Sequence, residues 1–97
     1  MVDVEYPLMW RQETIDKIWR KHRVCAEEVN EAVFDDRPIW TKGRRRTRLI
    51  LGRSVSGRYL FIVVVKRAGK GRYEVLTARE MMENEKRRYR KHFGGRL

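Results

Sequence analysis

The longest apolar stretch of this 97-residue chain reads Leu60-Phe61-Ile62-Val63-Val64-Val65 and follows Tyr59 directly. Alternate side chains of a strand point to opposite faces, so a strand over residues 58–66 would be apolar on both faces. Such a strand belongs inside a sheet, where other elements cover both of its sides. The stretch is also far shorter than the roughly 20 apolar residues of a membrane-spanning helix. We therefore expect the fold to form around this strand.

Two further strand patterns flank the apolar one, over residues 47–53 and 72–78. Short links that contain glycine join all three, and links of this kind form antiparallel hairpins. Earlier in the chain, Pro38 ends a helical pattern, because it has no N–H to donate and forces the preceding residue into an extended conformation. A loop or a short edge strand is expected from there to about Gly43. The sequence thus predicts a twisted antiparallel sheet of three to four strands.

Helical periodicity is present before and after the predicted sheet. The expected helices cover residues 12–21, 26–33 and about 80–92. The first helix has Ile15, Ile18 and Trp19 on one face, and His22 continues that face. The order of elements predicts an α+β fold with two N-terminal helices, the sheet and a C-terminal helix. A chain of this length has room for a single domain, residues 1–97.

Charge is distributed unevenly along the chain. Lys and Arg number 24 against 13 Asp and Glu, a formal net charge of +11. Residues 1–36 carry nine of the acids and only five bases, whereas residues 37–73 carry twelve bases and no acid. A segment without acids cannot form the ion pairs that a merely solubilising surface normally contains. It indicates an anionic partner, such as nucleic acid, an acidic protein or an anionic membrane, rather than a small neutral substrate.

The basic segment also contains aromatic residues, a combination that suits nucleic acid because cations neutralise phosphates and rings stack on bases. Seven candidate binding residues come from it: Lys42, Arg44, Arg45, Arg46, Arg48, Arg53 and Arg72. The alternative interpretation is a basic face that is simply solvated.

Candidates for catalysis are fewer. The imidazole of His22 is suited to proton transfer near neutral pH, but a histidine on the apolar face of a helix can also be a hydrogen-bonded core residue. Arg79 closes the last strand and could hold a phosphate or pair with Glu85, an acid on the apolar stripe of the last helix that needs a cationic partner. Arginines, one histidine and one tyrosine would suffice for a metal-free RNA phosphodiesterase whose nucleophile is the 2′-hydroxyl of the substrate.

No metal site and no other cofactor are predicted. One cysteine, Cys25, and two histidines show no zinc-ligand spacing, and a lone cysteine excludes an intramolecular disulfide. The pair Asp35-Asp36 precedes a proline and is more typical of a turn than of a magnesium site. The N-terminus is acidic where a secretory signal would be basic, so that we expect a cytoplasmic protein without a membrane segment.

Short motifs along most of the chain resemble the BrnT-type toxins of type II toxin–antitoxin systems. They are Lys21-His22-Arg23-Val24, Glu27-Glu28, Val33-Phe34-Asp35, Leu51-Gly52-Arg53-Ser54, Gly57-Arg58 and Thr77-Ala78-Arg79, followed by Glu85 and Tyr89. The resemblance implies a RelE-like ribonuclease fold and a cytosolic toxin that inhibits translation by cutting RNA. It also implies a ribbon-helix-helix antitoxin as the protein partner, in a hetero-oligomer with the toxin.

The same resemblance implies the candidate catalytic residues, which are His22, Arg58, Arg79, Glu85 and Tyr89. The two arginines would hold phosphate, His22 or Tyr89 would transfer a proton, and Glu85 would orient Arg79. The chain departs from the family pattern at Ile18, where an asparagine is usual, and at Glu74, where an arginine is usual. These departures leave a second hypothesis open, a catalytically inactive basic module that binds nucleic acid or an acidic partner.

Overall fold

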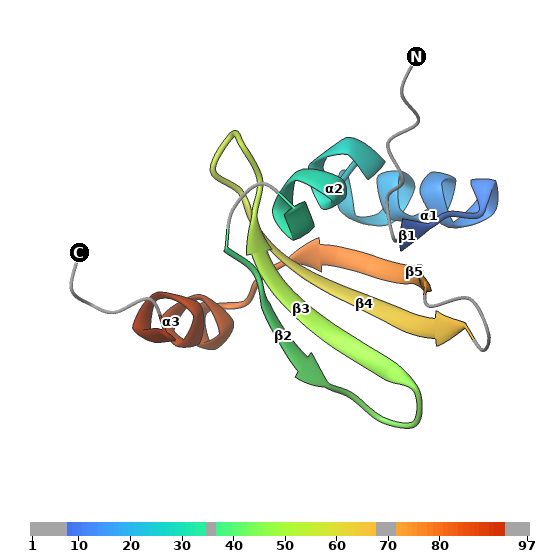
Figure 1. The fold of residues 1–97 in the computed structure, drawn as a ribbon. Coiled ribbons are helices and arrows are strands. Elements are labelled where there is room, and N and C mark those ends of the chain that lie inside the picture. The colour runs from blue at the N-terminus through green and yellow to red at the C-terminus, as the bar shows by residue number, and fades with distance from the viewer. Residues whose placement is uncertain (1–7, 35–36, 68–71, 93–97) are drawn as a thin grey trace, which may run out of the picture.

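The computed structural model describes residues 8–34, 37–67 and 72–92, which form a five-stranded sheet and three helices (Figure 1). In chain order the elements are β1 (Leu8–Met9), α1 (Gln12–His22), α2 (Ala26–Phe34), β2 (Ile39–Lys42), β3 (Thr47–Arg53), β4 (Tyr59–Arg67), β5 (Arg72–Glu80) and α3 (Glu83–His92). The strands lie in the order β1-β5-β4-β3-β2. The β2–β3, β3–β4 and β4–β5 pairs are antiparallel, and β1 pairs in parallel with β5.

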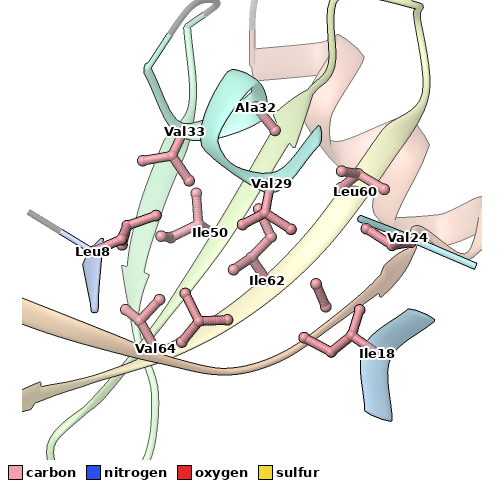
Figure 2. Packing of buried hydrophobic residues seen from close by; sticks show 12 residues of the cluster. Leu8, Ile18, Val24, Val29, Ala32, Val33, Ile50, Leu60, Ile62 and Val64 are labelled. Carbon is pink, nitrogen blue, oxygen red and sulfur yellow. The ribbon is translucent and has the colours of Figure 1, made fainter. Parts of the chain in front are cut away.

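The apolar strand β4 lies in the middle of the sheet, as predicted. Leu60, Ile62 and Val64 are fully buried on one face, whereas Phe61 and Val63 on the other face are half-buried. Helices α1 and α2 pack on the fully buried face. The core between the helices and the sheet consists of Leu8, Ile18, Val24, Val29, Ala32, Val33, Ile50, Leu60, Ile62, Val64, Val75 and Ala78 (Figure 2).

Helix α2 comes unusually close to β3 at Gly52. A Cβ atom at this position would lie 2.4 Å from the carbonyl oxygen of Ala32 in α2. Any other residue would therefore push the helix away from the sheet. The glycine of the Leu51-Gly52-Arg53-Ser54 motif thus sets the spacing between these two layers.

Helix α3 covers one end of the opposite face of the sheet. A second, smaller core there contains the buried residues Leu51, Met81 and Tyr89, packed with Ile39, Tyr59 and Phe61. Farther along the strands, Leu49, Val63 and Val65 of the same face are half-buried. The sheet therefore has a helix-covered face and a face that α3 covers at one end.

The α+β class and the three helices are as predicted, but the prediction of three to four antiparallel strands was wrong. The sheet has five strands, and β1 precedes the helices and pairs in parallel. A two-residue strand is too short to show an alternating pattern. Strand β2 is the short edge strand that was one of two expectations for this segment.

Two helix predictions also need correction. Helix α3 begins at Glu83 rather than near residue 80, because β5 continues to Glu80, which pairs with Leu60. Trp19 is 50% exposed and lies beneath the guanidinium of Arg23, so it is not part of the core. The predicted turn at Asp35-Asp36 lies outside the described residues. None of the described helices has the length and apolar composition needed to cross a membrane.

Candidate nucleic-acid interface and catalytic residues

Five cationic side chains line a pocket of about 430 Å³ where the β2–β3 hairpin meets the end of β4. They belong to Lys42, Arg45, Arg46, Arg48 and Lys66. Among the described residues, no acidic side chain lines this pocket. We call this set the cationic pocket. Because like charges held together repel one another, it favours a bound anion.

Backbone pairing brings these cations together. Lys42 and Arg48 are partners across β2 and β3, so their side chains leave the sheet on the same face. The N–H of Lys66 donates to the carbonyl of Arg46 at 3.2 Å and fixes the end of β4 against the hairpin. In the turn itself Arg45 adopts a left-handed conformation, with φ of 57°. The exposed arginines of the turn therefore project beside the strand ends.

Two aromatic residues neighbour cations of the pocket along the strands, although neither ring is among the described residues that line it. Trp40 lies two residues before Lys42 on the same face of β2, and Tyr73 is the register partner of Lys66. The rings of Trp40 and Tyr73 meet edge to face with centroids 5.1 Å apart. Trp40 is 39% exposed, so its ring is accessible for stacking against a base.

Most of the predicted nucleic-acid-binding residues gather at this end of the sheet. Lys42, Arg45, Arg46 and Arg48 line the cationic pocket, and Arg44 lies in the same turn. Arg53 lies at the other end of β3, about 17 Å from Arg48 along an extended strand. Arg72 is exposed at the start of β5, opposite Arg67. Lys66 was missed, because its nearness to the hairpin turn depends on strand register.

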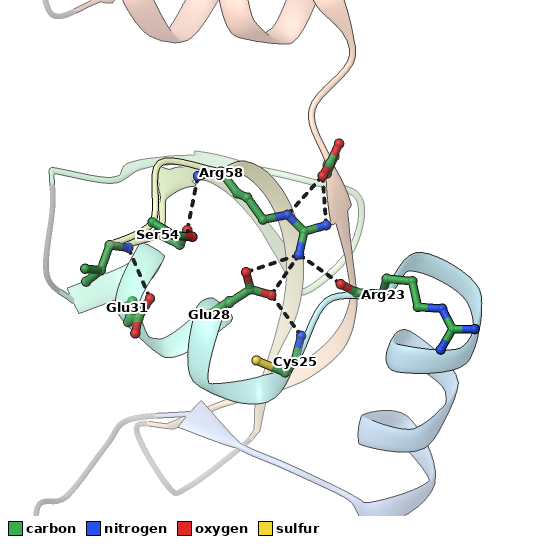
Figure 3. Close-up of polar contacts among 9 residues, drawn as sticks. Arg23, Cys25, Glu28, Glu31, Ser54 and Arg58 are labelled. Carbon is green, nitrogen blue, oxygen red and sulfur yellow. Dashed lines mark hydrogen bonds and ion pairs between the residues drawn. The ribbon is translucent and has the colours of Figure 1, made fainter.

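Arg58 is held by two carboxylates (Figure 3). Its Nη1 donates to Glu28 Oε1 at 2.9 Å and Oε2 at 3.1 Å, and also to the carbonyl of Arg23 at 2.8 Å. Its Nε donates to Glu80 Oε2 at 2.9 Å. The guanidinium thus ties the end of α1, the start of α2 and the end of β5 together. An RNA phosphate would have to displace a carboxylate to bind it.

Arg79 pairs with Glu85 on the opposite face of the sheet. Its Nη1 and Nη2 donate to the two Glu85 oxygens at 2.9 and 3.0 Å, and its Cζ lies 4.2 Å from the centroid of the Phe61 ring. The hydrogen bond from Arg79, together with one from the Met82 N–H, holds the pKa of the Glu85 carboxyl below its ordinary value. The expected cationic partner of Glu85 is therefore present.

The two arginine–glutamate pairs share one construction. Glu28 and Glu85 are each the third residue of their helix, and each accepts a hydrogen bond from the backbone N–H of the residue before that helix. This is the acidic half of a capping box. Arg58 and Arg79 thereby link the N-termini of α2 and α3 to the sheet.

Tyr89 and His22 occupy separate surroundings. Tyr89 is buried, and its hydroxyl donates to the carbonyl of Arg37 at 3.2 Å. His22 is the last residue of α1 and half-buried, and its imidazole forms no hydrogen bond with any residue that the structure describes. The five predicted catalytic residues therefore fall into two groups: Arg79, Glu85 and Tyr89 on the α3 side, and His22 and Arg58 on the α1–α2 side.

One residue that the sequence argument missed as a catalytic candidate is Tyr59. Cationic groups of Arg53, Lys86 and Arg90 lie 6.0, 6.0 and 5.6 Å from the centroid of its ring. The nearby guanidinium groups of Arg53 and Arg90 lower the pKa of the Tyr59 phenol. We call these four residues the tyrosine cluster. It lies on the same face of the sheet as Arg79, one diagonal strand position away.

Glu74, the acid that stands where the family pattern has an arginine, is an internal ion-pair partner. It is 6% exposed, accepts a 2.7 Å hydrogen bond from Arg67 Nε, and lies 2.8 Å from Arg11 Nε. It therefore joins the start of α1 to the β4–β5 hairpin. Across residues 8–34, 37–67 and 72–92, no group of three or more His, Cys, Asp or Glu side chains is arranged to hold a metal ion.

Comparison with known proteins assigns no family to the chain. No protein-family model matches it, and no curated protein sequence matches it.

Proposed function

We propose that this protein is a metal-independent endoribonuclease toxin of the BrnT type, which binds RNA through the cationic pocket and the adjoining hairpin turn. The observation that carries this proposal is the pocket, because five cations meet there without a described acid among them. A polyanion would relieve their mutual repulsion and release counterions on binding.

Stacking supports RNA as the polyanion. The exposed ring of Trp40 stands beside the pocket, so that one nucleotide can place its phosphate among the cations and its base against the ring. Sequence-tolerant stacking of this kind suits unpaired bases, since a base inside a duplex has no exposed face. The proposed substrate is therefore single-stranded RNA.

Cleavage would use the ribose of the substrate. Its 2′-hydroxyl attacks the adjacent phosphate, and the protein has to accept a proton and stabilise negative charge. Arg79 lies on the same face as the tyrosine cluster, opposite the cationic pocket, and both of its Nη atoms are bonded to Glu85, so a phosphate would have to compete with that carboxylate to reach it.

The test is cleavage of single-stranded RNA by the purified protein in EDTA. We expect products with a 5′-hydroxyl and a 2′,3′-cyclic or 3′-phosphate end. A matched strand with a single 2′-deoxy residue should resist cleavage at that position. Loss of cleavage in EDTA with recovery in magnesium, or a product with a 3′-hydroxyl, would contradict the proposed chemistry.

A second candidate function is a binding module without catalysis. It is favoured by Arg58, whose guanidinium is bonded to Glu28 and Glu80 instead of facing a ligand. This candidate predicts salt-dependent RNA binding by the purified protein without cleavage. The same two assays therefore separate the candidates.

For the protein partner, we propose a ribbon-helix-helix antitoxin in the cytosol, as the motif resemblance implies. The adjacent reading frame in the source genome should encode it. Co-expression of the two chains should give a complex that co-purifies and in which RNA cleavage is suppressed. A neighbouring frame of unrelated type, with no effect on cleavage, would remove the antitoxin from the proposal.

A further inference from the structure

Tyr59 stands at the junction of β3, β4 and α3, and the first and last of these supply its neighbours. It begins β4, its register partner on β3 is Arg53, and α3 brings Lys86 and Arg90 over the ring. The ring also meets the edge of Tyr89, with centroids 5.7 Å apart. The ring contact fixes the phenol in place, while the three cations surround it with positive charge.

This environment favours the phenolate. A free tyrosine has a pKa of about 10 and is almost entirely protonated at neutral pH. The neighbouring guanidinium groups of Arg53 and Arg90 favour a negative phenolic oxygen, and they lower the pKa of Tyr59 despite the opposing effect of burial. A group shifted in this direction becomes a better proton acceptor near neutral pH, because more of it is ionised.

The same cations can also bind the substrate. Guanidinium groups bind phosphate through paired hydrogen bonds. Tyr59 is half-buried, whereas Arg53 and Arg90 are exposed, so that a phosphate can approach from solvent. An RNA phosphate at these arginines would bring the neighbouring 2′-hydroxyl toward the phenol.

We propose that Tyr59 is a catalytic residue that accepts the 2′-hydroxyl proton during RNA cleavage, while Arg53 and Arg90 hold the scissile phosphate. This inference rests on the proposed ribonuclease function and names its proton acceptor. It differs from the motif-based candidates, because Tyr89 donates its hydroxyl to a backbone carbonyl and His22 belongs to the other layer of the fold.

The 2′-hydroxyl proton moves to the Tyr59 phenolate as the 2′-oxygen forms a bond to phosphorus. The bond between phosphorus and the 5′-oxygen breaks, and the 5′-oxygen takes a proton from water. The products are a 2′,3′-cyclic phosphate and a 5′-hydroxyl. Tyr59, now a neutral phenol, returns its proton to solvent before the next turnover.

The test compares Tyr59→Phe with Tyr89→Phe, which removes a hydroxyl from the neighbouring ring. Wild-type cleavage should rise with pH until Tyr59 is fully ionised. Tyr59→Phe should lose this rise and at least about 100-fold in rate, the usual scale of proton-transfer catalysis, whereas Tyr89→Phe should keep the rise. Arg90→Gln removes one cation, so it should move the rise to higher pH.

Ultraviolet titration of phenolate absorbance gives a readout that does not need cleavage. In the wild type one tyrosine should ionise below the others, and Tyr59→Phe should remove that transition while thermal unfolding shows an intact fold. If Tyr59→Phe cleaves RNA at the wild-type rate and with the wild-type pH profile, this inference is wrong and the proposed ribonuclease function is unaffected. A wild-type protein that cleaves no RNA would overturn the proposed function and this inference with it.

Discussion

The Arg79 guanidinium on β5 and the Glu85 carboxylate on α3 form a bidentate ion pair, with N···O distances of 2.9 and 3.0 Å. The same carboxylate accepts a hydrogen bond from the Met82 N–H at 2.7 Å and so caps α3. One side chain therefore docks the helix onto the sheet and orients the arginine. Since α3 also supplies Lys86 and Arg90, the geometry around Tyr59 depends on this pair.

Glu85→Gln should lower the free energy of unfolding by about 1–2 kcal/mol, because the partly buried Arg79 loses its charged partner. The amide can still accept the capping bond, so most of the loss reports the ion pair. Urea denaturation measures the effect. Glu83→Gln, at the first residue of α3, removes an equal charge that is exposed and should cost only about 0.5 kcal/mol. Equal losses in the two variants would mean that the pair adds nothing beyond helix capping.

Stability should decrease as the solution becomes acidic. Hydrogen bonds from Arg79 and from Arg67 hold the pKa values of Glu85 and Glu74 below their ordinary values in the folded protein. Unfolded glutamate has a pKa of about 4.3, so the unfolded chain binds protons first as the pH falls. Both carboxylates therefore contribute fully to the free energy of unfolding above that pH. Their contribution is lost as the pH falls through their lower pKa values in the folded protein.

Urea denaturation over a series of pH values measures this loss. The wild-type free energy of unfolding should start to fall near pH 5, and a Glu74→Gln variant should show a smaller slope below that pH. Parallel slopes would show that the Glu74 carboxylate has the same proton affinity in the folded and unfolded chains, contrary to its contacts with Arg67 and Arg11.

Local sequence patterns were sufficient to predict the helices and strands in which apolar residues follow a single clear periodicity. The alternating strand over residues 58–66 and the helix over residues 12–21 were predicted within one residue of β4 and α1. Strand β1 could not be predicted, because two residues carry no period and its parallel pairing with β5 is a tertiary contact. The end of β5 was placed too early, because Glu80 gives no sign in the sequence that it pairs with Leu60.

Some contacts of the candidate site residues could likewise be predicted from the sequence, and others could not. The ion pair of Arg79 with Glu85 could be predicted, because an acid on an apolar helical stripe needs a cation. The surroundings of Tyr59 could not be predicted, since two of its three neighbouring cations come from α3 and no local sequence pattern predicts where that helix docks. Likewise, the partners of Arg58 come from α2 and β5, which are distant in sequence.

RNA binding should weaken less with salt when the cationic pocket loses charge. For single strands the slope of log affinity against log salt is about −0.7 for each phosphate neutralised. Arg45→Glu/Arg46→Glu should therefore flatten the slope by about 1 or more, as read from fluorescence anisotropy at several salt concentrations. Lys17→Glu/Arg20→Glu makes the same change in charge on the exposed side of α1 and should change the slope much less. Equal effects would place the RNA elsewhere than in the pocket.

Gly52→Ala should destabilise the protein by about 1–3 kcal/mol, the usual range for overpacking. The added Cβ would lie 2.4 Å from the Ala32 carbonyl oxygen, so that α2 has to move. Thermal or urea unfolding measures the loss. Val55→Ala lies in the adjoining turn at 73% exposure and should stay within about 0.5 kcal/mol of the wild type. A fully stable Gly52→Ala protein would show that α2 adjusts without cost.

His22→Gln should fold normally and keep the pH dependence of RNA cleavage, because α1 packs on the face of the sheet opposite to Arg79 and Tyr59. The comparison needs unfolding curves and cleavage rates over a pH series from the same preparations, so that a damaged fold is not mistaken for a missing catalyst. Loss of cleavage in a well-folded His22→Gln protein would contradict this expectation. It would move the reaction to the end of α1, where the carbonyl of the next residue, Arg23, accepts a hydrogen bond from Arg58. The RNA phosphate would then have to compete with Glu28 for that guanidinium, and Glu28→Gln should increase cleavage by releasing it.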